Sequence, residues 1–495
     1  MEHLFGSLSV TSGLFLALAL ALAFSFEFVN GFHDTANAVA TVIYTNSLRP
    51  AYAVVWSGLW NLVGVLLSVG TVAFGILALL PVELVINVGS GAGFAMVFAL
   101  LVSAIIWNVG TWYLGLPASS THTLIGSIVG VGLANSVMSA GHTFGDGVNW
   151  AKLQDTVAAL LISPVMGFAL SALTLLLMKF LVRRPELYRE PDPGKAPTPW
   201  VRALLILTCT GVSFAHGTND GQKGMGLILL ILIGVIPGVF ALNLGLDAKT
   251  FSALNAQSSS AGSVLHRLSA SDPVSPADAT SVINAYLKST GKVTAQTIPA
   301  IAAENDAIEH ALAGKASLSA VPEGQRRDLR SSIYLVSNAI AKLQKAHAIT
   351  DKADSSALTD YTKLLDKATN FIPLWVKVAV ALCLGLGTMI GWKRIVVTVG
   401  ERIGKSHLTY GQGASAELIA YGTIQAANVF GLPVSTTHIL SSGVAGTMAA
   451  NHSGLQAGTL RNIILAWVLT LPVCVFLGSL LFAFGLRLVA ALGGH

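Results

Sequence analysis

Charged residues are scarce in this 495-residue sequence, where they make up 11% of the chain against 53% hydrophobic residues. So little charge excludes an ordinary soluble protein. The apolar stretches 13–29, 51–79 and 156–182 reach or exceed the roughly 17–25 residues that cross a bilayer. We therefore predict an all-α polytopic membrane protein.

Cysteines, and basic residues at the amino terminus, are also few. Cys209, Cys383 and Cys474 lie in apolar runs without the spacing of metal ligands, which predicts small buried residues and no disulfide framework. Residues 1–3 (MEH) lack the basic segment of a cleavable signal peptide, so we expect the first apolar run to be a retained helix. The net charge of +5 does not predict a nucleic-acid partner, because many basic residues lie in short loops beside predicted helices.

What the sequence does contain is a duplication. The peptide at 115–122 (GLPASSTH) returns at 431–438 (GLPVSTTH), and the segment at 30–37 (NGFHDTAN) aligns with that at 216–223 (HGTNDGQK). Each copy places polar residues inside sequence that is otherwise nearly all apolar. Duplicated halves of this kind are typical of transporters.

The spacing of the motifs locates an insertion in the second half. From Asp34 to Ser119 is 85 positions, whereas from Asp220 to Ser435 is 215, so the second half carries 130 extra residues. The polar stretch 243–371 is 129 residues long and accounts for almost all of them. Its near-balanced charge and regular apolar spacing predict a small helical extramembrane segment. No motif in it favours a regulatory or partner-binding role.

The basic loops predict the topology. No Lys or Arg precedes Arg49, whereas basic residues crowd the loop 183–200, which the positive-inside rule places in the cytoplasm. Five crossings precede this loop, so the amino terminus is expected outside and the second repeat runs inverted, with the basic loop 393–407 inside and 243–371 outside. Counting a broken helix as two crossings would reverse that last placement. The expected crossings are 13–44 (broken around Asp34), 51–79, 93–114, 119–138 and 156–182, then 201–242, 372–392, 408–430, 435–448 and 460–492.

These considerations divide the chain into four parts. The first transmembrane repeat is 1–182, the basic cytoplasmic loop is 183–200, the second, inverted repeat comprises 201–242 and 372–495, and the inserted segment is 243–371. We expect about five membrane crossings in each repeat, some of them broken helices.

The repeated Gly-Leu-Pro peptides point to an anion site. Proline disfavours helix at the residue before it, so a helix should begin just after Pro117 and Pro433. The free N–H groups and positive dipole end there attract an anion, and hydroxyls add donors without adding charge. The candidate anion-binding residues are Ser119, Ser120, Thr121, Ser435, Thr436 and Thr437. A single copy would more simply be a helix cap, but the duplication favours a site.

The other motif pair places two carboxylates in apolar sequence. Asp34 and Asp220 are expected to bind the coupling proton or a metal ion, because an intramembrane ionisable group is a functional candidate by default. The alternative for Asp220 is a structural ion pair with Lys223. Glu27, about two helical turns before Asp34, is a weaker relay candidate.

The segments 31–38 and 216–224, together with both Gly-Leu-Pro peptides, resemble the inorganic phosphate transporter (PiT) family, from about residue 10 to the carboxyl terminus and with most likeness to its low-affinity bacterial branch. The resemblance implies proton-driven phosphate uptake by alternating access and a multi-pass homodimer in the inner membrane. It implies no resident cofactor, phosphate being carried as a neutral complex with Mg²⁺ or another divalent ion.

The resemblance also assigns residues to roles. Sodium-coupled relatives carry Asn-Asp-x-x-Asn in both halves, whereas this chain has His33 for the first Asn and Lys223 for the last. An ammonium cannot ligate sodium, which favours protons. The phosphate ligands are expected to be the hydroxyls named above. The cation- or proton-coupling residues are expected to be Asp34, Asn37, Asn219, Asp220 and Lys223. The candidate proton relays are His33, His122, His438 and Glu27, although the two later histidines could equally be packing residues.

Other functions compete with proton-coupled phosphate uptake. A sodium-coupled phosphate symporter and a sulfate or other oxyanion permease are the nearest, since the same hydroxyls suit any tetrahedral anion. An anion channel and an intramembrane hydrolase are remote. No Gly-x-Ser-x-Gly or His-Glu-x-x-His peptide occurs, so we expect no enzyme activity.

Overall fold

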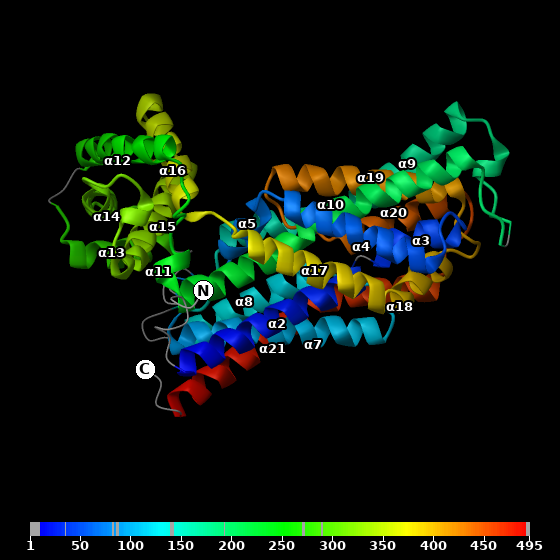
Figure 1. Ribbon diagram of the computed structural model, residues 1–495, viewed down its shortest axis with the longest axis horizontal. Coiled ribbons are helices and arrows are strands. Elements are labelled where there is room, and N and C mark those ends of the chain that lie inside the picture. The colour runs from blue at the N-terminus through cyan, green and yellow to red at the C-terminus, as the bar shows by residue number, and fades with distance from the viewer. Residues whose placement is uncertain are drawn as a thin grey trace.

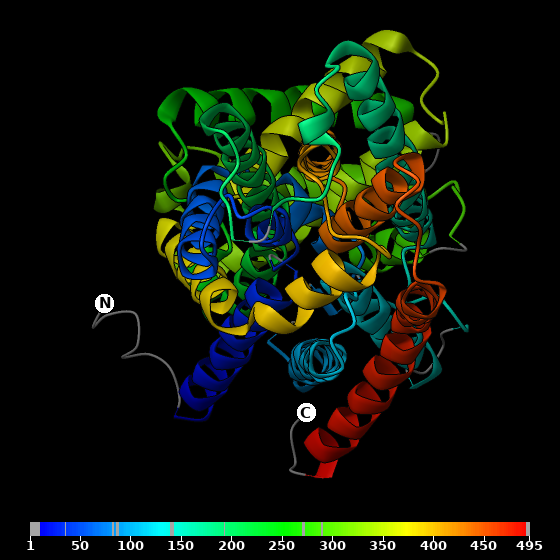
Figure 2. The ribbon, with the colours of Figure 1, turned by 90° about the vertical axis from the view of Figure 1, so that its right-hand side faces the viewer.

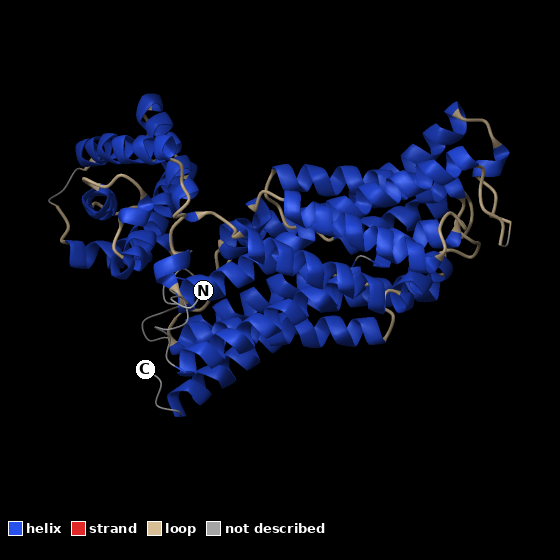
Figure 3. Cartoon of the chain, viewed as in Figure 1, coloured by secondary structure: helices blue, strands red, loops and turns tan. Residues whose placement is uncertain are grey.

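Helices supply the regular structure of this chain. The computed structural model describes residues 10–34, 36–81, 84–85, 89–138, 143–192, 194–269, 273–288 and 291–491. Within these residues no strand forms, and the only β-type pairing is an isolated bridge between Gly404 and Leu455 (Figure 3). The all-α prediction is confirmed.

The helices of the first half run from the amino terminus to the first basic loop. They are α2 (Val10–Asp34), α3 (Ala36–Tyr44), α4 (Pro50–Leu67), α5 (Thr71–Leu77), α7 (Gly91–Tyr113), α8 (Ser120–Met138), α9 (Trp150–Leu181) and the short η1 (Pro185–Leu187). The second half contains α10 (Pro199–Val235), α17 (Leu374–Gly391), α18 (Lys393–Val397), the π-helical turn η3 (Thr398–Arg402), α19 (Tyr410–Val429), α20 (Thr436–Ala450) and α21 (Ala457–Ala491). Figure 1 shows most of these helices running along the long axis of one bundle.

Eight helical spans in the described residues are long and apolar enough to cross a bilayer, counting α2 and α3 as one. Ten crossings were expected. The two that fall short are α19, which carries polar side chains such as Gln412, Glu417 and Asn428, and α20, which has only 15 residues. Both contribute to the buried polar centre described below, and this explains why they are less apolar or shorter than an ordinary span.

The outer helices expose apolar side chains, as a bilayer requires. Leu161, Leu173 and Phe180 project from α9, and Phe476 and Phe484 from α21, all more than 60% exposed. A soluble surface does not carry such continuous apolar faces. These faces fit contact with lipid.

Helix breaks fall mainly where the sequence predicts them. α2 ends at Asp34 and α3 resumes at Ala36, and α8 and α20 begin three residues after Pro117 and Pro433. Two details differ from expectation. The predicted crossing 51–79 is interrupted between α4 and α5, where Gly70 adopts a left-handed φ of 91°. In the second half α10 continues unbroken through Asp220, so only the first of the two aspartate motifs ends a helix.

The two halves exchange contacts reciprocally. α8 packs on α21 and α20 packs on α9, while α2 packs on α17 and α10 on α4. Glycines permit the close approach: a Cβ on Gly31 would lie 2.1 Å from the carbonyl oxygen of Leu384, and one on Gly217 would lie 2.3 Å from that of Asn61. Gly31 and Gly217 are equivalent positions of the duplicated motif. This recurrence is the packing that a duplication would produce.

The basic loops gather at one end of the bundle, which faces the viewer in Figure 2. There Nε of Arg202 donates to the carbonyl oxygen of Ser47 at 2.8 Å, and the backbone N–H of His407 donates to Oε1 of Glu190 at 3.1 Å. The inserted segment, the start of α2 and the end of α21 lie at the opposite end (Figure 1). The positive-inside rule would place the first end in the cytoplasm.

The inserted segment folds as a helical unit with its own core. Its helices are α12 (Ala248–Leu268), α13 (Pro276–Leu287), α14 (Thr297–Leu312), η2 (Leu318–Ala320), α15 (Glu323–Lys345) and α16 (Lys352–Thr369), and the short α11 (Pro237–Phe240), which precedes the segment, packs on α15. Buried Tyr361 donates to Oδ1 of Asn305 at 2.6 Å inside it. Nη1 of Arg330 donates to the carbonyl oxygens of Ala241 and Thr369, which tie the entry and exit of the unit together. The prediction of a helical insertion is confirmed.

Candidate functional site

The two aspartate motifs and the two Gly-Leu-Pro peptides meet inside the bundle. Every predicted site residue whose side chain the structure describes is at most 8% exposed. Among the described residues, these groups are therefore closed off from solvent, and the site is occluded in this sense.

Asp34 lies at the end of α2, and its carboxylate has hydrogen-bond partners on three helices, α2, α8 and α20. Oγ of Ser120 donates to its Oδ2 at 2.5 Å, and Oγ1 of Thr437 donates to its Oδ1 at 3.0 Å. Nδ1 of the neighbouring His33 lies 2.8 Å from Oδ1, while Nε2 of His33 lies 3.0 Å from Oγ1 of Thr111. Because Ser120 and Thr437 belong to different Gly-Leu-Pro peptides, Asp34 joins the two halves.

Asp220 forms the second pole of the site. Nζ of Lys223 lies 2.9 Å from its Oδ2, and both side chains are fully buried. The same oxygen is 3.3 Å from Nε2 of His216 and 3.5 Å from Oγ1 of Thr436. The ion pair that the sequence allowed for Asp220 and Lys223 is thus present.

Lys223 also connects the two halves of the chain by contacts to both. Its ammonium donates to the hydroxyl of Thr121, which in turn donates to the carbonyl oxygen of Val434 at 2.8 Å. One lysine of α10 is therefore held between the carboxylate of its own helix and the first Gly-Leu-Pro peptide. Four of the six predicted hydroxyl residues, Ser120, Thr121, Thr436 and Thr437, contact Asp34, Asp220 or Lys223.

The remaining two hydroxyls of that set cap helices. Oγ of Ser119 accepts from the backbone N–H of His122 at 3.2 Å, and Oγ of Ser435 accepts from that of His438 at 3.1 Å. This is the ordinary N-cap geometry that the sequence left open as the simpler interpretation. The caps fix where α8 and α20 begin and hence where the next two hydroxyls point.

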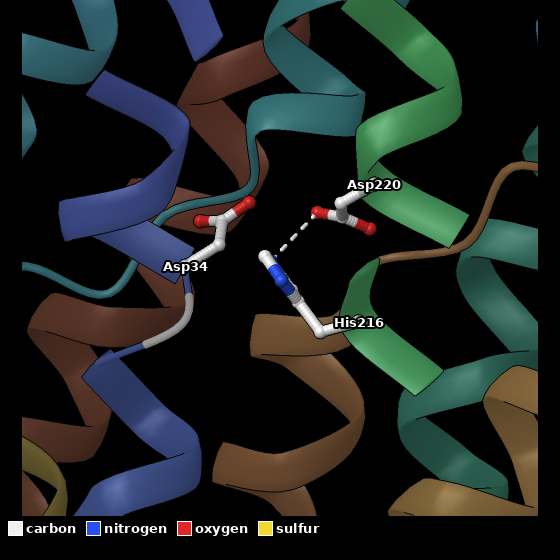
Figure 4. A group of neighbouring side chains, drawn as sticks. All are labelled: Asp34, His216 and Asp220. Carbon is white, nitrogen blue, oxygen red and sulfur yellow. Dashed lines mark ion pairs between the residues drawn. The ribbon is translucent and has the colours of Figure 1, made fainter. Parts of the chain in front are cut away.

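A group of potential cation ligands lies between the two poles. Single ligand atoms of Asp34, His216 and Asp220 all fall within 4.8 Å of one another, and the three side chains converge in Figure 4. Carboxylate oxygens suit Mg²⁺ and similar hard cations, and an imidazole widens the choice to transition metals. The residues present therefore fit a divalent ion.

His216 was not among the predicted site residues. Its position four residues before Asp220 is the signal that could have identified it, since residues i and i+4 share one helix face. Its other nitrogen, Nδ1, lies 2.7 Å from Oδ1 of Asn61 on α4. That contact fixes the ring toward Asp220.

The two Gly-Leu-Pro histidines pack against each other and against an aromatic ring. The rings of His122 and His438 are 4.5 Å apart, and His438 stacks on Trp467 at 4.0 Å. Nε1 of Trp467 donates to the carbonyl oxygen of Pro117 at 2.8 Å. The packing role that the sequence left open for both histidines is the one that these contacts favour.

The other predicted residues lie around the cluster. Nδ2 of Asn219 donates to Oδ1 of Asn428 at 2.7 Å, so it faces the start of the second Gly-Leu-Pro peptide. Glu27 is fully buried beside Gly224, where neither carboxyl oxygen has a hydrogen-bond partner among the described residues. Asn37 belongs to α3, but its side chain is outside the part that the structure describes.

Known proteins resemble this chain along nearly its whole length. The family model described as the phosphate transporter family matches residues 30–478. The low-affinity inorganic phosphate transporter PitB of Escherichia coli is 40% identical, covering 99% of this chain and 100% of that protein. PitA of Escherichia coli is 41% identical over 98% of this chain, and a low-affinity inorganic phosphate transporter of Buchnera aphidicola is 38% identical over 99% of it.

One solved structure shares the fold. It is described as the sodium-dependent phosphate transporter, with a TM-score of 0.52 over 96% of this chain and 100% of the other. Its sequence identity of 18% limits the likeness to the fold.

Proposed function

The chain belongs to the phosphate transporter family, and from this premise we propose that it takes up inorganic phosphate by proton symport, as a neutral complex with a divalent metal ion. Membership confirms the resemblance noted in the sequence and the expectation of a transporter and not an enzyme. The observation that carries the proposal is the burial of Asp34, Asp220 and the hydroxyls of both Gly-Leu-Pro peptides in one occluded cluster.

The pairing inside this cluster favours a metal–phosphate complex over bare phosphate. The hydroxyls of Ser120, Thr436 and Thr437 now donate to the two carboxylates. A metal ion would bind the carboxylates, and the hydroxyls would then be free to donate to phosphate oxygens. One neutral metal–phosphate complex would thus satisfy both the carboxylates and the hydroxyls. A bare phosphate would instead lie beside two carboxylates, and like charges at about 4 Å repel by roughly 4 kcal/mol at an effective dielectric constant of 20.

Lys223 supports proton coupling. Its ammonium lies 2.9 Å from the Asp220 carboxylate. A sodium ion bound to Asp220 would need an oxygen ligand at that position, and the ammonium cannot provide one. Asp34, Asp220 and Glu27 are then the groups that take up the coupling proton, with His33 next to Asp34 as a relay. Asn37 and Asn219 are proposed as further coupling residues, because each belongs to an aspartate motif.

We propose alternating access between two inverted repeats. The occluded cluster lies where elements of both halves meet, and opening either end would expose it to one side of the membrane. The protein is expected to act as a homodimer in the inner membrane, by analogy with the family that the sequence resembles.

The test is uptake of radiolabelled phosphate by proteoliposomes containing the purified protein. Imposed pH and sodium gradients are varied separately, with Mg²⁺ present or absent. We expect uphill uptake driven by an inward proton gradient alone and requiring Mg²⁺ or a similar ion. Uptake that needs sodium would reject proton coupling, and competition by sulfate would identify a broader oxyanion permease.

A further inference from the structure

A pocket of about 440 Å³ lies where the inserted unit meets the membrane bundle. Thr71 of α5 and Lys152 of α9 line it from the bundle, and Lys367 of α16 and Asn370 line it from the inserted unit. Gly431, the first residue of the second Gly-Leu-Pro peptide, forms part of its wall. The pocket is much larger than the roughly 30 Å³ share of one water molecule, so a hydrated anion fits it.

The charge around this pocket is positive. Among the ion pairs of the described residues neither Lys152 nor Lys367 takes part, although Asp155 lies one helical turn after Lys152 and pairs with Lys345 at 3.6 Å. The other acidic group, Asp366, accepts a hydrogen bond from Oγ of Ser337 at 3.3 Å. The pocket lining therefore carries two lysines, Lys152 and Lys367, and one aspartate, Asp366, so its formal charge is positive.

Two hydrogen bonds through Asn428 connect the wall of the pocket to the central cluster. Oγ1 of Thr71 donates to the backbone carbonyl of Asn428 at 3.2 Å, and the side chain of Asn428 accepts from Asn219, the neighbour of Asp220. Asn428 also donates to Oγ1 of Thr218 at 2.7 Å. These contacts link the wall of the pocket to the central cluster, so an anion held in the pocket would lie close to the site.

We propose that this pocket is an entry site that binds the phosphate anion before it reaches the central cluster, and that the inserted unit exists in part to complete it. The positive field raises the local concentration of phosphate at the mouth of the bundle. At the central cluster the anion would combine with a divalent ion held by Asp34 and Asp220, which gives the neutral complex of the proposed function. The inference rests on the proposed function, in which phosphate enters from the end that carries the inserted unit.

The first experiment measures phosphate uptake by K152Q and K367Q in proteoliposomes. Each variant is expected to raise the apparent KM about two- to fivefold at low ionic strength with Vmax unchanged, and the difference should vanish at high salt. The matched control is K363Q. Lys363 lies one turn before Lys367 on α16 and is exposed and paired with Asp360 at 2.8 Å, so its loss should leave KM unchanged.

A second experiment tests directly whether phosphate occupies the pocket. In K367C, an aminoethyl thiosulfonate restores a positive charge and should restore the low KM, whereas a sulfonatoethyl reagent should raise KM further. Phosphate should slow both labelling reactions, with the wild type treated alike to account for its own three cysteines. The inference is overturned if KM responds to K152Q and K367Q no more than to K363Q, or if phosphate does not slow labelling. Wild-type uptake in the same preparation would still uphold the proposed function, whereas its absence would reject both.

Discussion

Breaking the buried pair between Asp220 and Lys223 should be far more costly than breaking an exposed one. At 2.9 Å and an effective dielectric constant of about 20, the attraction is roughly 6 kcal/mol. Part of this is retained in K223Q, because Asp220 keeps its contacts with His216 and Thr436. We expect D220N and K223Q each to lower the free energy of unfolding by about 3–5 kcal/mol.

The double variant D220N/K223Q should be more stable than either single variant, because two neutral amides leave no uncompensated charge in the bundle. The measurement is a double-mutant cycle on equilibrium unfolding of the purified protein in mixed detergent micelles. The control cycle is D360N/K363Q, whose two residues are also three apart and 2.8 Å from each other but lie on the surface of α16. Exposed pairs of this kind contribute about 0–1 kcal/mol.

A transport measurement separates the role of Asp220 in coupling from a purely structural role of the ion pair. The double variant should recover stability but not phosphate accumulation, because Asp220 is also a proposed coupling residue. The reasoning is refuted if the coupling energy of the buried pair does not exceed that of the exposed control.

Three further predictions concern packing, coupling and affinity. Gly31→Ala should destabilise the bundle by several kcal/mol, since its Cβ would clash with the carbonyl of Leu384, whereas Gly13→Ala has open space and should be neutral in the same unfolding assay. Glu27→Gln should retain phosphate exchange across proteoliposomes yet lose uphill uptake driven by a pH gradient; unchanged accumulation would remove Glu27 from the coupling residues. Thr436→Ala should raise the apparent KM for phosphate about tenfold, whereas Thr436→Ser should restore it, and equal KM values for all three proteins would remove the hydroxyl from the binding site.

Local rules explain why much of the fold was predictable. Proline cannot continue a helix into the preceding residue, so the starts of α8 and α20 follow from Pro117 and Pro433 alone. The apolar runs and their lengths predict the spans, and the mismatch in motif spacing locates the inserted unit. The interruption at Gly70 was missed because the flanking sequence remains apolar on both sides of it.

Roles within the site depended on three-dimensional contacts. The sequence gives Ser119 and Ser120 the same chemistry, yet one caps α8 and the other donates to Asp34. A difference of one residue rotates a side chain by about 100° around a helix, and which direction is useful depends on what packs there. His216 was missed for the same reason, because only its contact with Asn61 aims it at Asp220.

The sequence by itself therefore determined the class, the duplication, the helix starts after Pro117 and Pro433 and the residue types of the site, since each follows from composition, period or the local chemistry of proline. Only the tertiary structure decided which half supplies the partner of each group. Thr437 reaches Asp34 across 403 positions of sequence, and Lys223 reaches Thr121 across 102. Such contacts exist because small residues let helices of opposite halves approach closely, and that packing is a property of the whole chain.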